Sequence, residues 1–413
     1  MFARWYEAPF KAKLARPYVH LMFGARQTGK STLIRKLLPE DRLEIDLADP
    51  SVRSRYLVDP EILIKECRGL PRRPGGACVF VDEAQSVPEI FDAVQHLFDG
   101  DKTRWRFVLC GSSARKLRKT GANLLPGRSF LHHLFPLTLA ERPPIPGRVK
   151  HTKPPLSFPW SGRTPSNLFE PADLETRLAF GELPGISTAP EEDRNELLRA
   201  YAVVHLEEEI RREAMVKDWA AFLRFLRLAA AESGQILNYA AISNESGLSQ
   251  PTVKSHYQLL EDMFIGFPIP AWSGSPRKHL LSTPRFMIFD LGLRHAAAGL
   301  RASRDIVRAN PGPLFEQWVG IELWKRLQYL RTGTLHYLRT KDGAEVDFIV
   351  AREGQLTPVE VKWTERPTLS DARHLLTFIR EHPKSAKHGY LICRCRLPMQ
   401  LHERVTALPW SCL

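Results

Sequence analysis

The stretch GARQTGKST, residues 24–32, decides the fold of the first part of this chain. It follows the apolar run VHLMF at residues 19–23 and opens the helical pattern KSTLIRKLL at residues 30–38. The segment fits GxxxxGK[ST], and a preceding strand with a following helix is the context that a phosphate-binding loop requires. We therefore predict a nucleotide-binding loop of nine residues, Gly24, Ala25, Arg26, Gln27, Thr28, Gly29, Lys30, Ser31 and Thr32.

The residue types of this loop predict ATP and Mg²⁺ as cofactors. The glycines allow backbone N–H groups to close around phosphates, and the helix N-terminus adds a favourable dipole. Lys30 can reach the β and γ phosphates, and the hydroxyl of Ser31 can bind Mg²⁺. Lys30 is therefore a predicted catalytic residue, and Ser31 is a predicted metal ligand.

The segment CVFVDE at residues 78–83 supplies the second half of the predicted ATP site. Four apolar residues followed by Asp82 and Glu83 are typical of a Walker B strand. Asp82 would hold Mg²⁺ directly or through water, and Glu83 would polarise the attacking water. A buried strand followed by a polar turn is the alternative, but the pairing of both motifs in one α/β segment argues against it.

Four further residues, two serines and two arginines, are candidates for a part in hydrolysis. The strand FVLCGSS at residues 107–113 ends in Ser112 and Ser113, and one of these hydroxyls can act as a sensor near the γ-phosphate. Arg115 and Arg128 follow, and a neighbouring subunit could present either arginine in trans. A surface contact or a contact with a polyanion is an equally weighted interpretation of both arginines.

Several segments along the chain resemble a widespread bacterial and archaeal family of AAA-type ATPases. Members of that family are often known only as ATP-binding proteins with a C-terminal domain of unknown function. The resemblance implies nucleotide hydrolysis, a winged-helix middle and a nuclease-like end, although Glu182 stands where the family often has a second glycine. The matching segments are GARQTGKST, GSSARKLRKTGANLLPGR, FPLTLAE, GELPGI, FDLGL, GPLFEQWVGIEL, AEVDFIV and VEVKW.

The organisation of the chain predicts an α/β protein of several domains. Alternating short strands and amphipathic helices predict a mostly parallel sheet at the N-terminal end. Helical periodicity dominates the middle, and mixed structure returns near the C-terminus. The predicted parts are a P-loop AAA-type ATPase core (1–141), a Pro-rich basic insertion or loop (142–171), a helical lid or linker (172–235), a winged helix-turn-helix (236–300) and a restriction-endonuclease-like α/β domain (301–413).

The pattern ILNYAAISNESGLSQPTVKSHYQLLEDM, from residue 236, predicts a helix-turn-helix. Two short helices flank a turn at Gly247, and Ser249 is placed to cap the second helix. In a DNA-binding version the second helix enters the major groove. The alternative is packing against a protein, since the fold alone does not determine the function. The candidate DNA contacts are Gln250, Thr252, Lys254, Ser255 and His256.

An acidic cluster near the C-terminus predicts a second metal site. Asp347 lies in a strand, and the segment VEVK follows with Glu360 and Lys362 on one face, because alternate strand residues share a face. These residues, with Glu316 on the preceding helix, resemble the PD-(D/E)xK nuclease core. Its carboxylates would bind Mg²⁺, and its lysine would orient or activate water. A salt-bridged pair of exposed strands, or an acid cluster kept for DNA binding, are the alternatives.

Charge and composition favour a nucleic-acid partner. The 413 residues carry a net charge of +13, from 59 Lys and Arg against 46 Asp and Glu. Such a basic balance favours a polyanion, with nucleic acid ahead of a membrane surface. The six cysteines show no CxxC spacing, and neither a signal-peptide core nor a membrane-length apolar run is present. We therefore expect a soluble, cytoplasmic protein.

These observations lead to three functional hypotheses. The first is an ATPase that assembles as a homo-oligomeric ring, with a hexamer favoured, and remodels branched or broken DNA such as Holliday junctions. The second is a nucleotide-dependent switch in signalling or phage defence that acts through protein partners. The third is a metal-dependent DNA nuclease whose ATPase gates access to the nuclease site.

Overall fold

The computed structural model describes residues 2–112, 125–142, 169–206, 210–211, 216, 218–273, 283–340 and 343–413. The chain divides into two compact units. Unit 1 comprises Met1–Pro136 with Leu259–Ile265, and unit 2 comprises Leu137–Gln258 with Gly266–Leu413. The predictions for Ser113, Arg115 and most of the Pro-rich segment lie outside the described residues.

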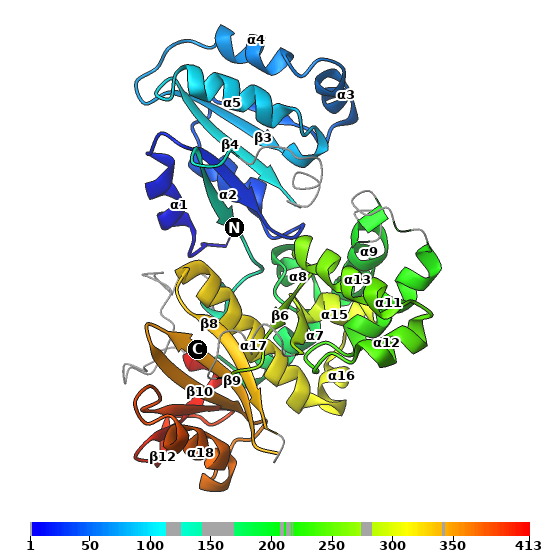
Figure 1. Cartoon of the computed structure of the whole chain (residues 1–413), viewed down its shortest axis with the longest axis vertical. Coiled ribbons are helices and arrows are strands. Elements are labelled where there is room, and N and C mark those ends of the chain that lie inside the picture. The colour runs from blue at the N-terminus through cyan, green and yellow to red at the C-terminus, as the bar shows by residue number, and fades with distance from the viewer. Residues whose placement is uncertain are drawn as a thin grey trace. The chain divides into compact units, whose positions relative to one another are not determined.

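A five-stranded parallel sheet forms the centre of unit 1, as the alternating pattern predicts. Its strand order is β2-β3-β4-β1-β5, and every neighbouring pair is parallel. Figure 1 shows its helices, in blue and cyan, around the strands. The strands are β1 (Val19–Phe23), β2 (Leu43–Asp46), β3 (Ala77–Asp82), β4 (Trp105–Gly111) and β5 (Ser129–His133). The helices are α1 (Glu7–Leu14), α2 (Lys30–Leu37), α3 (Pro50–Val58), α4 (Ile62–Gly69) and α5 (Ile90–Gly100).

The strands predicted at VHLMF, CVFVDE and FVLCGSS are confirmed as β1, β3 and β4, and β5 is an addition. Its sequence SFLHH has two histidines and no regular alternation, so its pattern is weak. The partner of β5 is β1, with Leu21 opposite Leu131. Every residue of β1 and β3 is buried, because helices on both faces of a parallel sheet exclude water from its central strands.

Helices make up the first part of unit 2, and the first long helix begins at Pro171, one residue before the predicted boundary. Proline suits the first turn of a helix because its missing N–H would have no intrahelical partner there. The helical elements here are α7 (Pro171–Phe180), α8 (Pro184–Thr188), α9 (Glu191–Ala200), the π-helix η3 (Tyr201–Leu206), α11 (Trp219–Ala231), α12 (Tyr239–Ser246), α13 (Gln250–Asp262), α15 (Leu291–Ala297) and α16 (Arg304–Ala309). The last four residues of α13 belong to unit 1.

The turn between α12 and α13 follows the predicted capping pattern. Gly247 adopts a left-handed conformation (φ 74°) and ends α12. The hydroxyl of Ser249 accepts a hydrogen bond from the Thr252 N–H at 3.3 Å, at the beginning of α13. A two-stranded antiparallel ribbon follows, formed by β6 (Gly266–Ile269) and β7 (Arg285–Ile288).

A mixed six-stranded sheet of order β12-β13-β11-β10-β9-β8 forms the C-terminal part of unit 2. The pairs β8–β9, β9–β10 and β12–β13 are antiparallel, whereas β11 lies parallel to both β10 and β13. Leu375 and Phe378 of the helix α18 lie in one apolar core with Ile349 and Leu391 of the sheet. The elements are α17 (Pro311–Leu330), β8 (Thr334–Arg339), β9 (Glu345–Arg352), β10 (Gln355–Val361), α18 (Arg373–Glu381), β11 (Gly389–Cys393), β12 (Met399–His402) and β13 (Val405–Pro409).

Candidate functional site

The phosphate-binding loop lies between β1 and α2, at the carboxyl end of the parallel strands. Ligands bind at this edge in open α/β sheets. Gly24 has a φ of 151°, and a Cβ there would come 2.2 Å from the carbonyl oxygen of Leu134. The first position of the motif must therefore be glycine for two reasons, the backbone conformation and the close approach of the chain after β5.

Lys30 lies across the loop that precedes it. Its Nζ donates to the carbonyl oxygens of Gly24 at 2.7 Å and Ala25 at 2.8 Å. The side chain is buried, with 6% of its surface exposed. A buried ammonium at the start of a helix produces a strongly positive position where an anion can bind.

An N-terminal arginine supports the loop from the side, and the sequence motif gave no sign of it. The guanidinium of Arg4 donates to the carbonyl oxygens of Thr28 at 2.6 Å and Phe135 at 2.5 Å. Thr28 in turn donates its hydroxyl to the carbonyl of Ala25 at 2.9 Å. These bonds connect residues up to 131 positions apart, so no local pattern could have predicted them.

The carboxylate pair after β3 lies near Lys30. The Asp82 carboxylate accepts a hydrogen bond from the Glu83 N–H at 3.1 Å, and the Arg35 guanidinium of α2 lies 3.4 Å from its other oxygen. Burial raises the pKa of the Cys110 thiol well above its ordinary value, and charges on Lys30, Asp82 and Glu83 act on the same thiol. The predicted catalytic residues of both motifs are therefore neighbours in space.

Hydrogen bonds through Gln85 connect Glu83 to Ser112, and no local sequence pattern predicts them. The Gln85 amide nitrogen donates to a carboxylate oxygen of Glu83 at 2.5 Å and to the Ser112 hydroxyl at 3.0 Å. A Cβ on Gly111 would lie 2.4 Å from the Gln85 amide oxygen, so the glycine provides the space for this amide. Since β4 lies between β3 and β1, its end places Ser112 between the two motifs.

The residues present fit a magnesium ion with a nucleotide. The hydroxyl of Ser31 has no hydrogen bond to any described residue and is partly exposed. The Asp82 carboxylate is buried and has contacts with the Glu83 N–H, the Arg35 guanidinium and the Cys110 side chain, and none of these is a bound cation. Hydroxyl and carboxylate oxygens are ligands that Mg²⁺ prefers. When bound, the ion would neutralise charge on the β and γ phosphates.

Arg128 lies at the amino ends of the parallel strands, whereas the phosphate-binding loop lies at their carboxyl ends. It precedes β5, and its carbonyl accepts from the Val19 N–H at the amino end of β1. Its guanidinium forms an ion pair with Asp99 at 2.6 Å. Arg128 therefore cannot reach a phosphate bound by its own subunit, and both the predicted role in trans and a contact at the protein surface or with a polyanion remain predictions.

The acidic residues predicted near the C-terminus come together in unit 2. Asp347 on β9 accepts a hydrogen bond from the Val361 N–H of β10 at 2.8 Å. The Lys362 ammonium donates to Glu360 at 2.7 Å, so these two side chains share a face as predicted. Asp347 and Glu360 are both buried, with 6% and 4% exposed surface. One oxygen of Glu360 is buried without a hydrogen-bond partner.

Burial and mutual repulsion make these carboxyl groups hard to ionise. Burial, followed by the charge of Asp347, raises the pKa of Glu360 to about 8 and the pKa of Glu316 to about 7. Burial also raises the pKa of Asp347. Burial by itself would lower the pKa of the Lys362 ammonium. The charge of Glu360 and its hydrogen bond with Lys362 outweigh burial, so the pKa of Lys362 is raised. A cation bound among these groups would be favoured for the same electrostatic reason.

Glu316 has a different partner from the one that the sequence suggested. Arg285 of β7 forms ion pairs with Glu316 and Glu345, both at 2.5 Å. Within the described ranges, no group of three or more His, Cys, Asp or Glu side chains has a geometry that could hold a metal ion. The three-carboxylate metal site of Glu316, Asp347 and Glu360 therefore stays a prediction, and metal binding there would require Glu316 to leave Arg285.

The candidate DNA contacts on α13 differ in their accessibility. Gln250, Lys254 and Ser255 are exposed, whereas Thr252 and His256 are only partly exposed. The His256 ring lies 4.9 Å from the ring of Phe222 on α11. This packing gives His256 a structural role, and it leaves the three exposed residues as the candidates for contact with a partner.

A buried ionic network unites several of the family-like segments in unit 2. Arg177 has no exposed surface and pairs with Asp173 at 2.6 Å and with Glu182 at 2.7 Å. Asp290 accepts a hydrogen bond from the Glu182 N–H at 2.6 Å. Glu182, in the segment GELPGI, is therefore an acidic centre of this network.

Comparison with protein families assigns the N-terminal part. Residues 16–142 match the family described as AAA domain. Residues 171–304 match the domain of unknown function DUF8612, and residues 311–413 match the domain of unknown function DUF4143. The chain therefore carries an AAA domain, which implies nucleotide binding and hydrolysis, typically with Mg²⁺.

Curated relatives extend along most of the chain. An uncharacterized protein of Mycobacterium tuberculosis is 26% identical over 366 residues, covering 88% of this chain and 74% of the relative. One of Haemophilus influenzae is 25% identical over 362 residues, covering 83% and 82%. A crystal structure of a Vibrio cholerae protein aligns with 95% of this chain and 94% of its own, at 11% identity and a TM-score of 0.18, which is too low to indicate a shared fold. No helix in the described ranges has the length and apolar character needed to cross a membrane.

Proposed function

We propose that this chain is an oligomeric AAA-type ATPase that binds and remodels DNA, with branched DNA such as a Holliday junction as the expected substrate. Lys30, Asp82 and Glu83 perform hydrolysis, and Ser112 senses the γ-phosphate through Gln85. A neighbouring subunit supplies an arginine, either Arg128 or one outside the described residues. The oligomer is a homo-oligomeric ring, with a hexamer favoured.

The observation that carries the DNA assignment is the acidic cluster of unit 2. Asp347, Glu360 and Lys362 lie together on paired strands, and one buried Glu360 oxygen lacks a hydrogen-bond partner. The cluster follows the helix α17, and β10 continues through α18 into the parallel strand β11. This arrangement supports the nuclease-like interpretation of the C-terminal domain. The basic net charge of +13 supports a polyanionic partner.

The helix-turn-helix and the ribbon of β6 and β7 support a winged-helix interpretation of the middle region. The exposed Gln250, Lys254 and Ser255 can face a DNA groove or its phosphates. Hydrolysis in unit 1 would then change the position of these elements on bound DNA.

One experiment tests the proposal directly. ATP turnover by the full chain is measured with Mg²⁺ alone and with duplex, single-stranded or four-way-junction DNA, at low and moderate salt. We expect the junction to give the largest stimulation, and we expect DNA affinity to fall steeply as salt rises because bound counterions are released. Turnover that no DNA changes, together with no DNA binding at low salt, would contradict the DNA role and leave the ATPase assignment intact.

A second candidate function is a nucleotide-dependent switch that acts through protein partners. It is favoured by the side-chain contacts of α13. Lys254 lies 5.1 Å from the ring of Tyr239, and His256 packs on Phe222. Few basic side chains of α13 then remain to contact a DNA groove.

A third candidate function is the ATP-gated nuclease. The variant Asp347→Ala distinguishes it from the remodelling ATPase, because this variant should leave remodelling intact but remove any cleaved product.

A further inference from the structure

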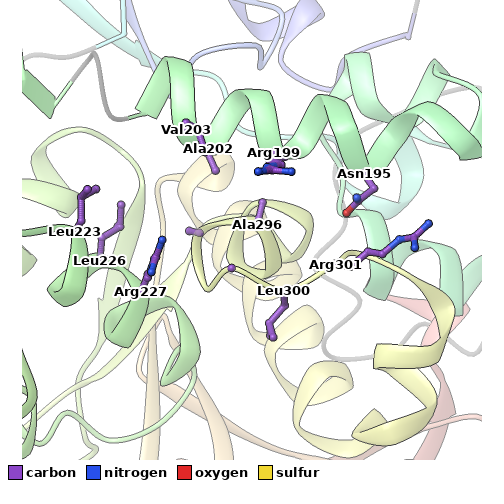
Figure 2. Close-up of a pocket in the computed structure, with 12 residues that line it drawn as sticks. Asn195, Arg199, Ala202, Val203, Leu223, Leu226, Arg227, Ala296, Leu300 and Arg301 are labelled. Carbon is purple, nitrogen blue, oxygen red and sulfur yellow. The ribbon is translucent and has the colours of Figure 1, made fainter. Parts of the chain in front are cut away.

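A pocket in unit 2 combines positive charge with an apolar floor. Its volume is about 460 Å³, within the range of small-molecule sites. It lies between the helix α9 with its π-helical continuation η3, the helix α11, and the end of α15. Figure 2 shows Arg199 above Ala296, with Arg227 to one side and Arg301 beside Asn195 to the other.

Three arginines around this pocket are without partners in the part of the chain that the structure describes. Arg199, Arg227 and Arg301 make no hydrogen bond, ion pair or ring contact with any described residue. Two arginines nearby differ, because Arg304 pairs with Glu191 at 2.8 Å and Arg194 donates to a carbonyl at 3.0 Å. No aspartate or glutamate is among the described residues that line the pocket. Among the described residues, therefore, none compensates the three positive charges at the rim of the pocket.

The pocket also offers an amide donor. The side-chain oxygen of Asn195 accepts a hydrogen bond from the Ala302 N–H at 2.9 Å. This bond orients the amide and leaves its nitrogen without a partner among the described residues. Guanidinium groups bind phosphate through paired N–H donors, and a nearby amide N–H can add another bond to the same group.

The floor of the pocket is apolar. Ala202, Leu226 and Ala297 line it and are at most 8% exposed, while Leu300 is 44% exposed at its edge. Ala202 belongs to η3, where a π-helical turn replaces the α-helix. Such turns often occur at functional sites because the wider turn displaces side chains locally. A ligand that fits must therefore have both an anionic group and an apolar part.

We propose that this pocket binds a small phosphate ester, with its phosphate at Arg199, between the positive charges of Arg227 and Arg301 on either side, and its apolar part on the floor. Two sources share this chemistry, a nucleoside monophosphate and an alkyl phosphate. The backbone of a nucleic acid is a poorer fit, because phosphates along a strand require no enclosed apolar floor. The site lies entirely in unit 2 and is separate from the phosphate-binding loop of unit 1. It therefore stands whether or not the chain acts on DNA.

Calorimetry on the full chain tests this site. The phosphate-binding loop is first saturated with a non-hydrolysable ATP analogue and Mg²⁺, and AMP, dodecyl phosphate and inorganic phosphate are then titrated separately. We expect AMP or dodecyl phosphate to bind at least tenfold more tightly than inorganic phosphate, since only these probes use the floor. The tighter of the two probes identifies the source of the apolar part.

Variants connect any binding to the arginines. The double variant Arg199→Gln with Arg227→Gln should weaken the tighter probe at least tenfold, whereas Arg396→Gln, an exposed arginine of the C-terminal sheet region, should leave it unchanged. The three substituted arginines, Arg199, Arg227 and Arg396, are exposed, so the variants should keep the wild-type unfolding temperature. The proposal is overturned if neither ester binds more tightly than inorganic phosphate, if the double variant binds like the wild type, or if a single-stranded oligonucleotide displaces the ester with a steep salt dependence.

Discussion

Replacing Lys30 by alanine should remove ATP hydrolysis. The Lys30 ammonium is 6% exposed and donates to two carbonyl oxygens of its own loop, at 2.7 and 2.8 Å. It is therefore held where the phosphates of a nucleotide would lie. Loss of one preorganised donor to developing charge costs about 2.7–4 kcal/mol, a factor of roughly 10²–10³ in turnover. We expect at least this loss, because lysine carries a full charge.

The same substitution should weaken the loop itself. Lys30→Ala removes two charge-assisted hydrogen bonds, and such bonds contribute about 1.5–3 kcal/mol each. Released carbonyls can bond to water, so the net loss in the free energy of unfolding should be on the order of 2 kcal/mol. Phosphate release at saturating MgATP measures turnover, and thermal unfolding with and without nucleotide measures binding and stability.

Lys36→Ala is the matched control on the same helix. Lys36 is exposed and pairs with Glu7 at 2.8 Å, an ion pair of the kind that contributes about 0–1 kcal/mol. Its turnover should equal that of the wild type. If Lys30→Ala does not fold, Lys30→Arg keeps the charge and should fold with greatly reduced turnover. Wild-type turnover in a folded Lys30 variant would refute the assignment of the ATP site.

Four further predictions concern other parts of the molecule. Glu83→Gln should slow hydrolysis by about 10²-fold or more while nucleotide still raises the unfolding temperature. If the variant loses both turnover and this rise in unfolding temperature, Glu83 serves nucleotide binding. Asp347→Ala should abolish any DNA cleavage but leave ATP turnover unchanged, and retained cleavage would exclude the acidic cluster as its source. Arg177→Met should lower the free energy of unfolding by about 3–5 kcal/mol in urea titrations, because it breaks the buried ion pairs with Asp173 and Glu182 and leaves Glu182 only Arg142, at 3.2 Å, as an ion-pair partner; a change below 1 kcal/mol would argue against this. Burial lowers the pKa of His295 to about 4, so the unfolded state binds the proton first and stability should fall by about 3 kcal/mol between pH 6.5 and 4. His295→Phe should flatten that part of the pH profile, and an unchanged slope would assign it to other groups.

The core of the ATP site could be predicted because its signals are local. A glycine-rich loop after a strand requires only neighbouring residues, and the structure places Gly24 and Lys30 as the motif predicts. Strand alternation likewise brought Glu360 and Lys362 to one face. The strand β5 was missed because SFLHH has no regular period, and its position depends on pairing with β1.

Contacts between distant segments could not be predicted in this way. Arg4 donates a hydrogen bond to Phe135, 131 positions away in the sequence, and Gln85 donates one to Ser112, 27 positions away. Arg285 pairs with Glu316, 31 positions away, although the sequence predicts Glu316 as a metal ligand. Each contact depends on which strands and helices become neighbours. A residue's own sequence pattern does not specify that.

The sequence by itself determined the parallel sheet with its phosphate-binding loop, the helix-turn-helix and the face that Glu360 shares with Lys362. These features follow from periodicity, capping and the special backbone freedom of glycine, all of which act over a few residues. Only the tertiary structure decided which polar groups satisfy one another, as in the Gln85 bridge to Glu83 and the buried Arg177 network. Burial makes an unsatisfied polar group costly, so these partners are selected by the packing of the whole fold.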